Sequence, residues 1–147
     1  NLPRGPKSVK HFKLVHGSPL DEDHYLVYTE DADDLRGYLV EPLWFFGHTH
    51  LQGAFQLHRN GTRVVRAVPP TETERWIELE PDSIYLINPG SVGQPRDGDP
   101  RAAYALYDTG DRAVQLRRVR YPIEKAQRKI VEAGLPAPLA QRLAVGR

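Results

Sequence analysis

Three histidines of this chain follow short apolar runs, and their spacing suits metal binding. The tetrapeptide Gly47-His48-Thr49-His50 comes directly after the apolar residues 43–46. His48 and His50 are expected on the same face of a strand, because side chains alternate between the two faces. Imidazole nitrogens bind zinc, iron, nickel and related metals. The pair therefore indicates half of a metal site, although a His-x-His pair by itself also fits surface residues or satisfied core residues.

A second histidine cluster lies upstream. His16 follows Lys13-Leu14-Val15 and precedes Gly17-Ser18-Pro19, a tripeptide that turns the chain. Two strands that each deliver histidine from their carboxyl ends would build a site on one rim of a sheet, where α/β sheets bind ligands. His16 alone would fit a buried residue bonded to the backbone. Together, the two clusters favour a metal site formed by His16, His48 and His50.

A strand-rich body is expected to position these residues. Apolar and alternating runs predict strands at residues 11–16, 43–46, 54–59, 62–67, 76–80, 84–88, 102–107 and 113–119. Asn60-Gly61 predicts a type I′ hairpin turn that sets Leu57 opposite Val64. Residues 69–74 are polar and marked by proline, which predicts a loop.

Helices are expected at two places. Asp31-Ala32-Asp33-Asp34 reads as the acidic start of a helix rather than as a set of metal ligands. From Tyr121 onward, apolar residues at helical spacing predict two short amphipathic helices interrupted by Gly134-Leu135-Pro136. The chain therefore divides into a strand-rich body over residues 1–120 and a helical tail over 121–147.

The composition excludes several kinds of site. The chain has no cysteine, so any metal must be held by histidine, carboxylate or amide groups. The total of 20 basic and 19 acidic side chains is nearly balanced, and the basic residues of the tail fit a solvated helix face better than a nucleic-acid surface. No apolar stretch is long enough to cross a membrane, and no signal peptide is evident in these residues. The lack of cysteine favours a cytoplasmic protein.

The sequence resembles the calcineurin-like metallophosphoesterases, within them a bacterial and archaeal subgroup of small phosphoesterases. The resemblance rests on three segments and covers nearly the whole chain: Leu14-Val15-His16-Gly17-Ser18-Pro19, Phe46-Gly47-His48-Thr49-His50, and Leu86-Ile87-Asn88-Pro89-Gly90-Ser91-Val92-Gly93-Gln94-Pro95-Arg96. It implies the C-terminal half of a layered α/β sandwich. The family's Asp-x-His, Gly-Asp and Gly-Asn-His motifs do not occur, and the chain contains no methionine. We therefore expect an N-terminal half to be absent from this chain.

The resemblance also implies roles for the histidines. His16 and His48 would bind one divalent metal ion and His50 a second, with Mn, Fe, Ni and Zn all possible. The bridging aspartate and the remaining ligands would come from the N-terminal half. We therefore expect this chain to be catalytically incompetent by itself.

The loop after residues 84–88 supplies candidate substrate-binding residues. Asn88 and Ser91 belong to a turn whose backbone N–H groups suit an anion, although a purely structural turn fits equally. Arg96 could bind a phosphate bidentately, or Asp97 and Asp99 could hold Arg96 or Arg101 in an ordinary surface network.

The implied reaction is hydrolysis of a phosphodiester or phosphomonoester at a dinuclear metal centre. The expected partners are the N-terminal half of the domain and a small phosphoester or nucleotide-like substrate, with a homo-oligomer possible. A membrane partner is not expected, and nucleic acid is a minor option. The alternative is a non-catalytic protein-binding scaffold on the same fold.

Overall fold

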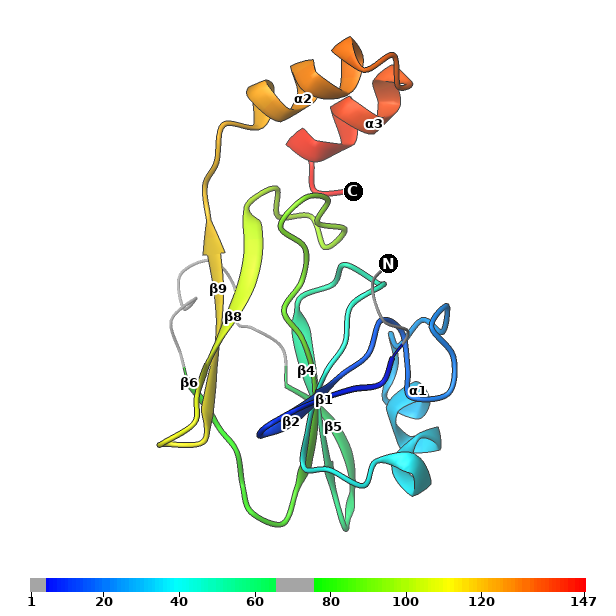
Figure 1. Cartoon of the computed structure of the whole chain (residues 1–147), viewed down its shortest axis with the longest axis vertical. Coiled ribbons are helices and arrows are strands. Elements are labelled where there is room, and N and C mark those ends of the chain that lie inside the picture. Colours follow the sequence, from blue (N-terminus) through cyan, green and yellow to red (C-terminus); the bar gives the residue numbers. More distant parts are fainter. Residues whose placement is uncertain (1–4, 66–75) are drawn as a thin grey trace.

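The computed structural model describes residues 5–65 and 76–147. These residues form two β-sheets that face each other, a short helix on the outer face of the larger sheet, and a pair of helices at one end (Figure 1). The mixed α/β fold predicted from the sequence is confirmed. The predicted loop at 69–74 and the end of the strand predicted at 62–67 lie outside the described residues.

The larger sheet has six strands in the order β1-β2-β3-β7-β4-β5. The strands are β1 (Lys7–Val9), β2 (Phe12–Leu14), β3 (Leu43–Phe45), β4 (Gly53–His58), β5 (Gly61–Val65) and β7 (Ile84–Asn88). β2 pairs in parallel with β3, and β3 with β7, whereas the other neighbours are antiparallel. Strands that are distant in the sequence therefore end at the same edge of the sheet.

The apolar run of β3 is buried on both sides, as expected for a strand in a parallel pair covered on both faces. Successive side chains of the strand point to opposite faces and so enter two hydrophobic clusters: Trp44 belongs to one, and Leu43 and Phe45 belong to the other. The first cluster includes Ala32 and Leu35, contributed by helix α1 (Thr29–Asp34) and its end. The central strands are thus held between α1 and the second sheet.

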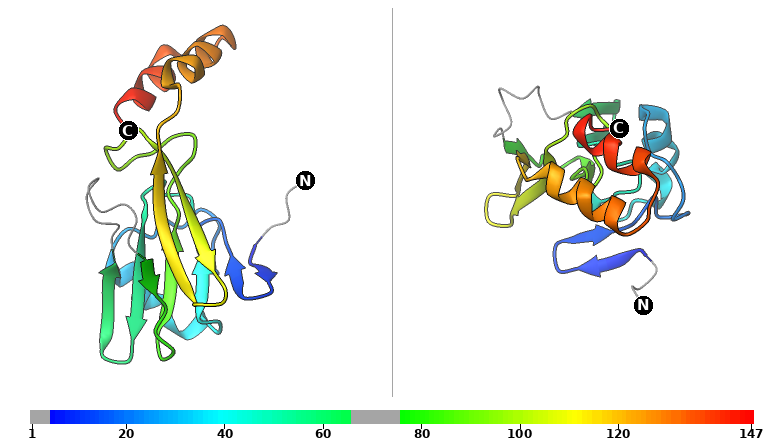
Figure 2. Two further views of the ribbon diagram at one scale, coloured as in Figure 1. Left: turned by 90° about the vertical axis from the view of Figure 1, so that its left-hand side faces the viewer. Right: turned by 90° about the horizontal axis from the view of Figure 1, so that it is seen from above.

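The second sheet contains three strands in the order β6-β9-β8, all antiparallel. They are β6 (Trp76–Glu78), β8 (Ala102–Asp108) and β9 (Ala113–Val119). Val114 and Leu116 of β9 pack against Phe45 and Ile87 of the larger sheet. Figure 2 shows β8 and β9 as a long ribbon that leads from this contact toward the helical end of the molecule.

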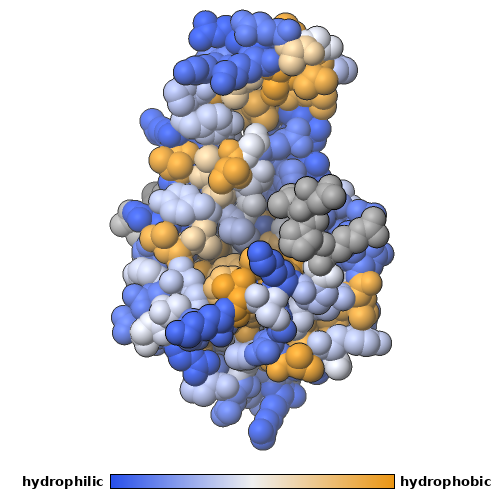
Figure 3. Space-filling model, viewed as in Figure 1, coloured by the Kyte–Doolittle hydropathy of each residue, from blue (hydrophilic) through white to orange (hydrophobic). Residues whose placement is uncertain are grey.

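The C-terminal tail is a helical hairpin made of α2 (Ile123–Glu132), α3 (Ala137–Gln141) and the 3₁₀ turn η2 (Arg142–Ala144). Gly134, at φ 73°, ends the first helix, as the sequence predicts. The hairpin lies beyond the sheets (Figures 1 and 2), and Gly98 N–H donates to the Gly146 carbonyl at 3.0 Å to attach its end. Apolar side chains remain on its surface (Figure 3), among them Val131, Leu135 and Val145.

None of the helices in the described parts of the chain has the length and apolar content required to span a membrane.

The hairpin between β4 and β5 differs from the prediction. Leu57 lies opposite Thr62, and Val64 lies opposite Phe55. The strands pair His58 with Gly61, so the connecting residues are Arg59 and Asn60, and only Gly61 has a positive φ, of 134°. A type I′ turn needs positive φ at both central residues, which this loop does not supply.

Two further elements, β1 and α1, differ from the sequence prediction. The sequence did not predict β1, a short exposed strand paired with β2. Helix α1 begins at Thr29, two residues before the predicted acidic stretch. Its start is stabilised by Asp31, whose Oδ2 accepts the backbone N–H groups of Val27 and Tyr28, both at 2.8 Å.

Candidate metal centre

The parallel pairing of β2 with β3 brings His16 and His48 together. Backbone bonds continue past both strand ends: Val15 N–H donates to the Phe45 carbonyl at 3.0 Å, and Gly47 N–H donates to the His16 carbonyl at 2.8 Å. The two imidazoles consequently meet, with Nδ1 of His48 2.9 Å from Nε2 of His16. The predicted meeting of these two histidines at one edge of the sheet is observed.

The backbone of the His48–His50 segment is not a strand. β3 ends at Phe45, and both histidines have φ 60°, in the left-handed region. Residues other than glycine adopt this region uncommonly, and histidine does so more often than most. The expectation that strand alternation places His48 and His50 on one face is therefore wrong, because the chain turns directly after β3. Their directions are set by this loop.

Tyr25 covers one side of the His48 ring, with the ring centroids 4.1 Å apart. Nε2 of His48 is buried and has no hydrogen-bond partner among the described residues. The aromatic contact was not predicted from the sequence. It arises because the chain folds tightly after His16: Ser18 Oγ accepts the N–H of Asp21 at 3.1 Å, and a Cβ on Gly17 would lie 2.5 Å from the Glu22 carbonyl oxygen.

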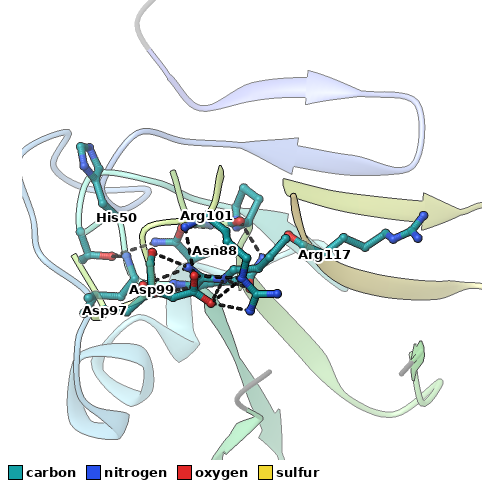
Figure 4. A network of polar contacts seen from close by, with 12 residues as sticks. His50, Asn88, Asp97, Asp99, Arg101 and Arg117 are labelled. Carbon is teal, nitrogen blue, oxygen red and sulfur yellow. Dashed lines mark hydrogen bonds and ion pairs between the residues drawn. The ribbon is translucent and has the colours of Figure 1, made fainter. Parts of the chain in front are cut away.

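His50 is oriented by the loop after β7. Its Nδ1 lies 2.8 Å from the carbonyl oxygen of Gln94. A carbonyl only accepts, so Nδ1 carries the proton, and Nε2 of the neutral ring keeps its lone pair for a metal. The backbone N–H of Arg96 donates to the backbone carbonyl of His50 at 3.3 Å. Figure 4 shows the His50 ring directed away from the polar network around Asp97 and Asp99.

The three candidate substrate residues, Asn88, Ser91 and Arg96, have different surroundings in the structure. Asn88 is 1% exposed and fully engaged with backbone and Thr49, so the predicted contact with a substrate does not fit its burial. Ser91 Oγ accepts the N–H groups of Gly93 and Gln94, which makes it a turn-forming residue. Arg96 is the least engaged of the three: within residues 5–65 and 76–147 its Nε is buried without a partner, and its Nη2 makes a long 3.4 Å contact to Gln94 Oε1.

The surface network predicted for these aspartates is observed in part: Asp99 holds Arg101, whereas neither Asp97 nor Asp99 holds Arg96 among the described residues. Asp97 binds Arg118, and Asp99 binds Arg101 through Nη2 at 2.5 Å. The hydrogen bond from Arg101 lowers the pKa of Asp99, against the opposing effect of burial. Arg118 has a side chain only 8% exposed.

Gln52 connects this network to the histidine loop, and sequence reasoning did not single it out. Its Nε2 donates to three backbone carbonyls, those of Pro89, Tyr104 and Arg117. Its Oε1 accepts Nε of Arg118 at 2.9 Å. The second sheet is thereby tied to the chain two residues after His50.

The donor set fits a metal only in part. Two imidazole nitrogens at about 2.0–2.1 Å from one metal lie about 2.9 Å apart at the right angle of an octahedral centre and about 3.3 Å apart at the tetrahedral angle. The His16–His48 separation of 2.9 Å fits the first geometry, and it is also a hydrogen-bond distance. The buried, unpartnered Nε2 of His48 adds a polar atom that this part of the chain leaves unsatisfied. However, no group of three or more His, Cys, Asp or Glu side chains in the described residues is arranged to hold a metal. A complete centre needs further ligands.

Comparison with known proteins identifies the fold. A protein from Sphaerobacter thermophilus, described as a metallophosphoesterase, has a solved structure that matches this one with a TM-score of 0.81 and 32% sequence identity. The match covers 96% of this chain and 58% of that chain. The chain has the fold of a metallophosphoesterase segment. No family model matches its sequence.

Two other proteins are similar to this metallophosphoesterase segment. The uncharacterized protein MJ0912 of Methanocaldococcus jannaschii is 36% identical over 144 residues, which cover 96% of this chain and 55% of that protein. The hypothetical protein PH1004 of Pyrococcus horikoshii OT3 shares the fold, with a TM-score of 0.64 at 18% identity, over 92% of this chain and 46% of that chain. The chain thus spans little more than half the length of the curated relative it matches.

Proposed function

We propose that this chain contributes to a dinuclear metal centre that hydrolyses phosphoesters. The observation that carries the proposal is the 2.9 Å separation of His16 Nε2 and His48 Nδ1. Two ligands of one metal ion can lie this far apart, and the distance is also that of a hydrogen bond between the two rings.

The histidines divide between two metal ions in this proposal. His16 and His48 hold one ion, and His50 offers Nε2 to the other because Gln94 fixes its Nδ1 proton. Divalent ions such as Mn, Fe, Ni or Zn would bind the phosphate oxygens and acidify the attacking water. The further ligands, including the anionic bridge, belong to the part of the domain that the relatives have and this segment does not span.

Arg96 is the proposed substrate residue. Its backbone lies beside His50 through the 3.3 Å bond to the His50 carbonyl, and its Nε lacks a partner in the described chain. A guanidinium that is not neutralised by a carboxylate can bind two phosphate oxygens at once. The proposed substrate is a small or nucleotide-like phosphoester, held by Arg96 next to the second metal ion.

A second candidate function is a protein-binding scaffold on the same fold. The exposed apolar side chains of the helical tail, Val131, Leu135 and Val145, favour it, because exposed apolar groups gathered on one element suit a protein partner. The retained histidine pair favours the enzyme, since a scaffold needs no adjacent imidazoles.

The test is hydrolysis of bis-p-nitrophenyl phosphate and p-nitrophenyl phosphate by the full-length protein, with each of Mn²⁺, Fe²⁺, Ni²⁺ and Zn²⁺. His50→Ala should abolish turnover, and Arg96→Ala should raise KM. His58→Ala is the matched control, because His58 lies at the end of β4, beside the hairpin turn to β5, and contacts Asn60. It should keep wild-type rates. If the wild type cleaves neither ester with any of the four ions, the scaffold function takes precedence.

A further inference from the structure

The Asn88 side chain bonds to both neighbours of His48. Its Nδ2 donates to the carbonyl of Gly47 at 3.0 Å and to Oγ1 of Thr49 at 2.8 Å. Its Oδ1 accepts the N–H of Gly90 at 2.8 Å. The orientation of the amide is unambiguous, because the Gly47 carbonyl only accepts and the Gly90 N–H only donates. A buried amide thus uses both of its ends, one on each side, to join two loops (Figure 4).

The histidine loop needs such a contact. His48 and His50 both have φ 60°, which is unfavourable for residues with a side chain. Such conformations persist only where the surrounding structure imposes them. Thr49 lies between the two histidines and is 3% exposed, so its bond to Asn88 acts inside the protein, where it does not compete with water.

The same loop sets the distance between the two metal-binding rings. Gly47 N–H is bonded to the backbone of His16, and the Gly47 carbonyl is bonded to Asn88. Movement of Gly47 would therefore shift His48 relative to His16. We propose that Asn88 is a positioning residue of the metal centre: its amide holds Gly47 and Thr49 so that His48 Nδ1 faces His16 Nε2. That the two histidines bind a metal rests on the proposed function. That Asn88 holds the two rings facing each other does not.

The first test is the Mn²⁺ affinity of the full-length protein, measured by isothermal titration calorimetry. Asn88→Asp removes both donors and keeps the acceptor for Gly90, and should raise the Kd about 10- to 100-fold, as loss of a residue that orients a metal ligand does. Thr49→Val removes one of the two acceptors at nearly constant shape and should raise the Kd less. Wild-type affinity in Asn88→Asp would overturn the proposal, and if that variant does not fold, wild-type affinity in Thr49→Val would.

Gln56→Glu is the matched control. Gln56 is another buried amide of the same sheet, 2% exposed, and its Nε2 donates to Glu80 and Ser83, away from the histidines. The substitution makes the same amide-to-carboxylate change in β4. It should leave the Mn²⁺ Kd of the folded protein unchanged. A rise as large as that of Asn88→Asp would assign the effect to general destabilisation and overturn the positioning role.

A metal-free measurement separates this proposal from the proposed function. The His16 and His48 ring centroids lie 4.8 Å apart, close enough for a nuclear Overhauser effect between ring protons. This signal should be present in the metal-free wild type and lost in Asn88→Asp. If the wild type binds no Mn²⁺ but the signal is lost in the variant, the proposed function fails and the positioning role stands. If the signal persists in the variant, the positioning role fails.

Discussion

Nδ1 of His48 and Nε2 of His16 lie 2.9 Å apart although 32 positions separate the two residues in the chain. The contact is a product of the sheet, because each histidine follows one of two parallel, adjacent strands. Both histidines lie just after the end of a strand, so the loop that follows each strand sets the direction of its ring. The site therefore combines a rigid edge with two loops that other side chains hold in place.

Removal of either paired histidine should remove most of the metal affinity. We expect His16→Ala and His48→Ala each to raise the Mn²⁺ Kd of the full-length protein by about 100-fold or more, since a direct ligand should matter at least as much as the groups that orient it. Elemental analysis of purified protein is a second measure. Tyr25→Phe is the control, because it keeps the ring over His48. Wild-type metal content in His48→Ala would contradict the assignment.

Gly90→Ala should destabilise the fold. Gly90 has φ 85°, and an added Cβ would lie 2.6 Å from Cβ of Ala103 and 3.0 Å from Cβ of Gln52. Backbone strain and overpacking together should cost about 2–4 kcal/mol in the free energy of unfolding, measured by urea titration. Gly93→Ala, in the same loop, meets no atom within 4 Å and should change stability by less than about 0.5 kcal/mol. Equal effects of the two substitutions would refute the steric explanation.

Arg118→Gln should destabilise the protein strongly, because it leaves Asp97 without its charged partner at a poorly exposed position. The expected loss is about 3 kcal/mol in the free energy of unfolding. The double variant with Asp97→Asn should lose less than the sum of the two single variants, as expected for residues in one network. Lys13→Gln is the control: its ion pair with Glu41 is 4.0 Å long and should contribute less than about 1 kcal/mol. Additive losses at Arg118 and Asp97 would argue against their coupling.

Asp99 should contribute to the loss of stability in acid. The hydrogen bond from Arg101 holds the pKa of Asp99 below its ordinary value of 3.8. The contribution is therefore complete above the unfolded-state pKa and is lost as the pH falls through the lower folded-state pKa. Asp99→Asn should flatten the dependence of unfolding free energy on pH below about 4. Arg101→Gln should flatten it in the same way, because it removes the donor. If both variants keep the wild-type dependence of unfolding free energy on pH below about 4, Asp99 does not contribute to the loss of stability in acid.

Local pattern was sufficient for most of the regular structure. Apolar runs such as residues 84–88 and 113–119 became strands with the expected bounds, and Gly134 separated the two tail helices as predicted. The residue types of the histidine clusters also indicated metal chemistry. The strands and the break between the helices depend on neighbours within a few positions, so the amino-acid sequence alone determined them. The metal chemistry stays a prediction.

The tertiary structure decided how these parts meet. The order of the strands brought His16 to His48, the loop gave His48 and His50 a left-handed backbone, and burial turned Asn88 from a candidate substrate residue into a structural contact. The hairpin register was set by pairing along β4 and β5, which overrode the local turn preference of Asn60-Gly61. Each of these outcomes depends on hydrogen bonds and packing between distant segments. A local pattern carries no information about them, because their free energy exists only once the chain is folded.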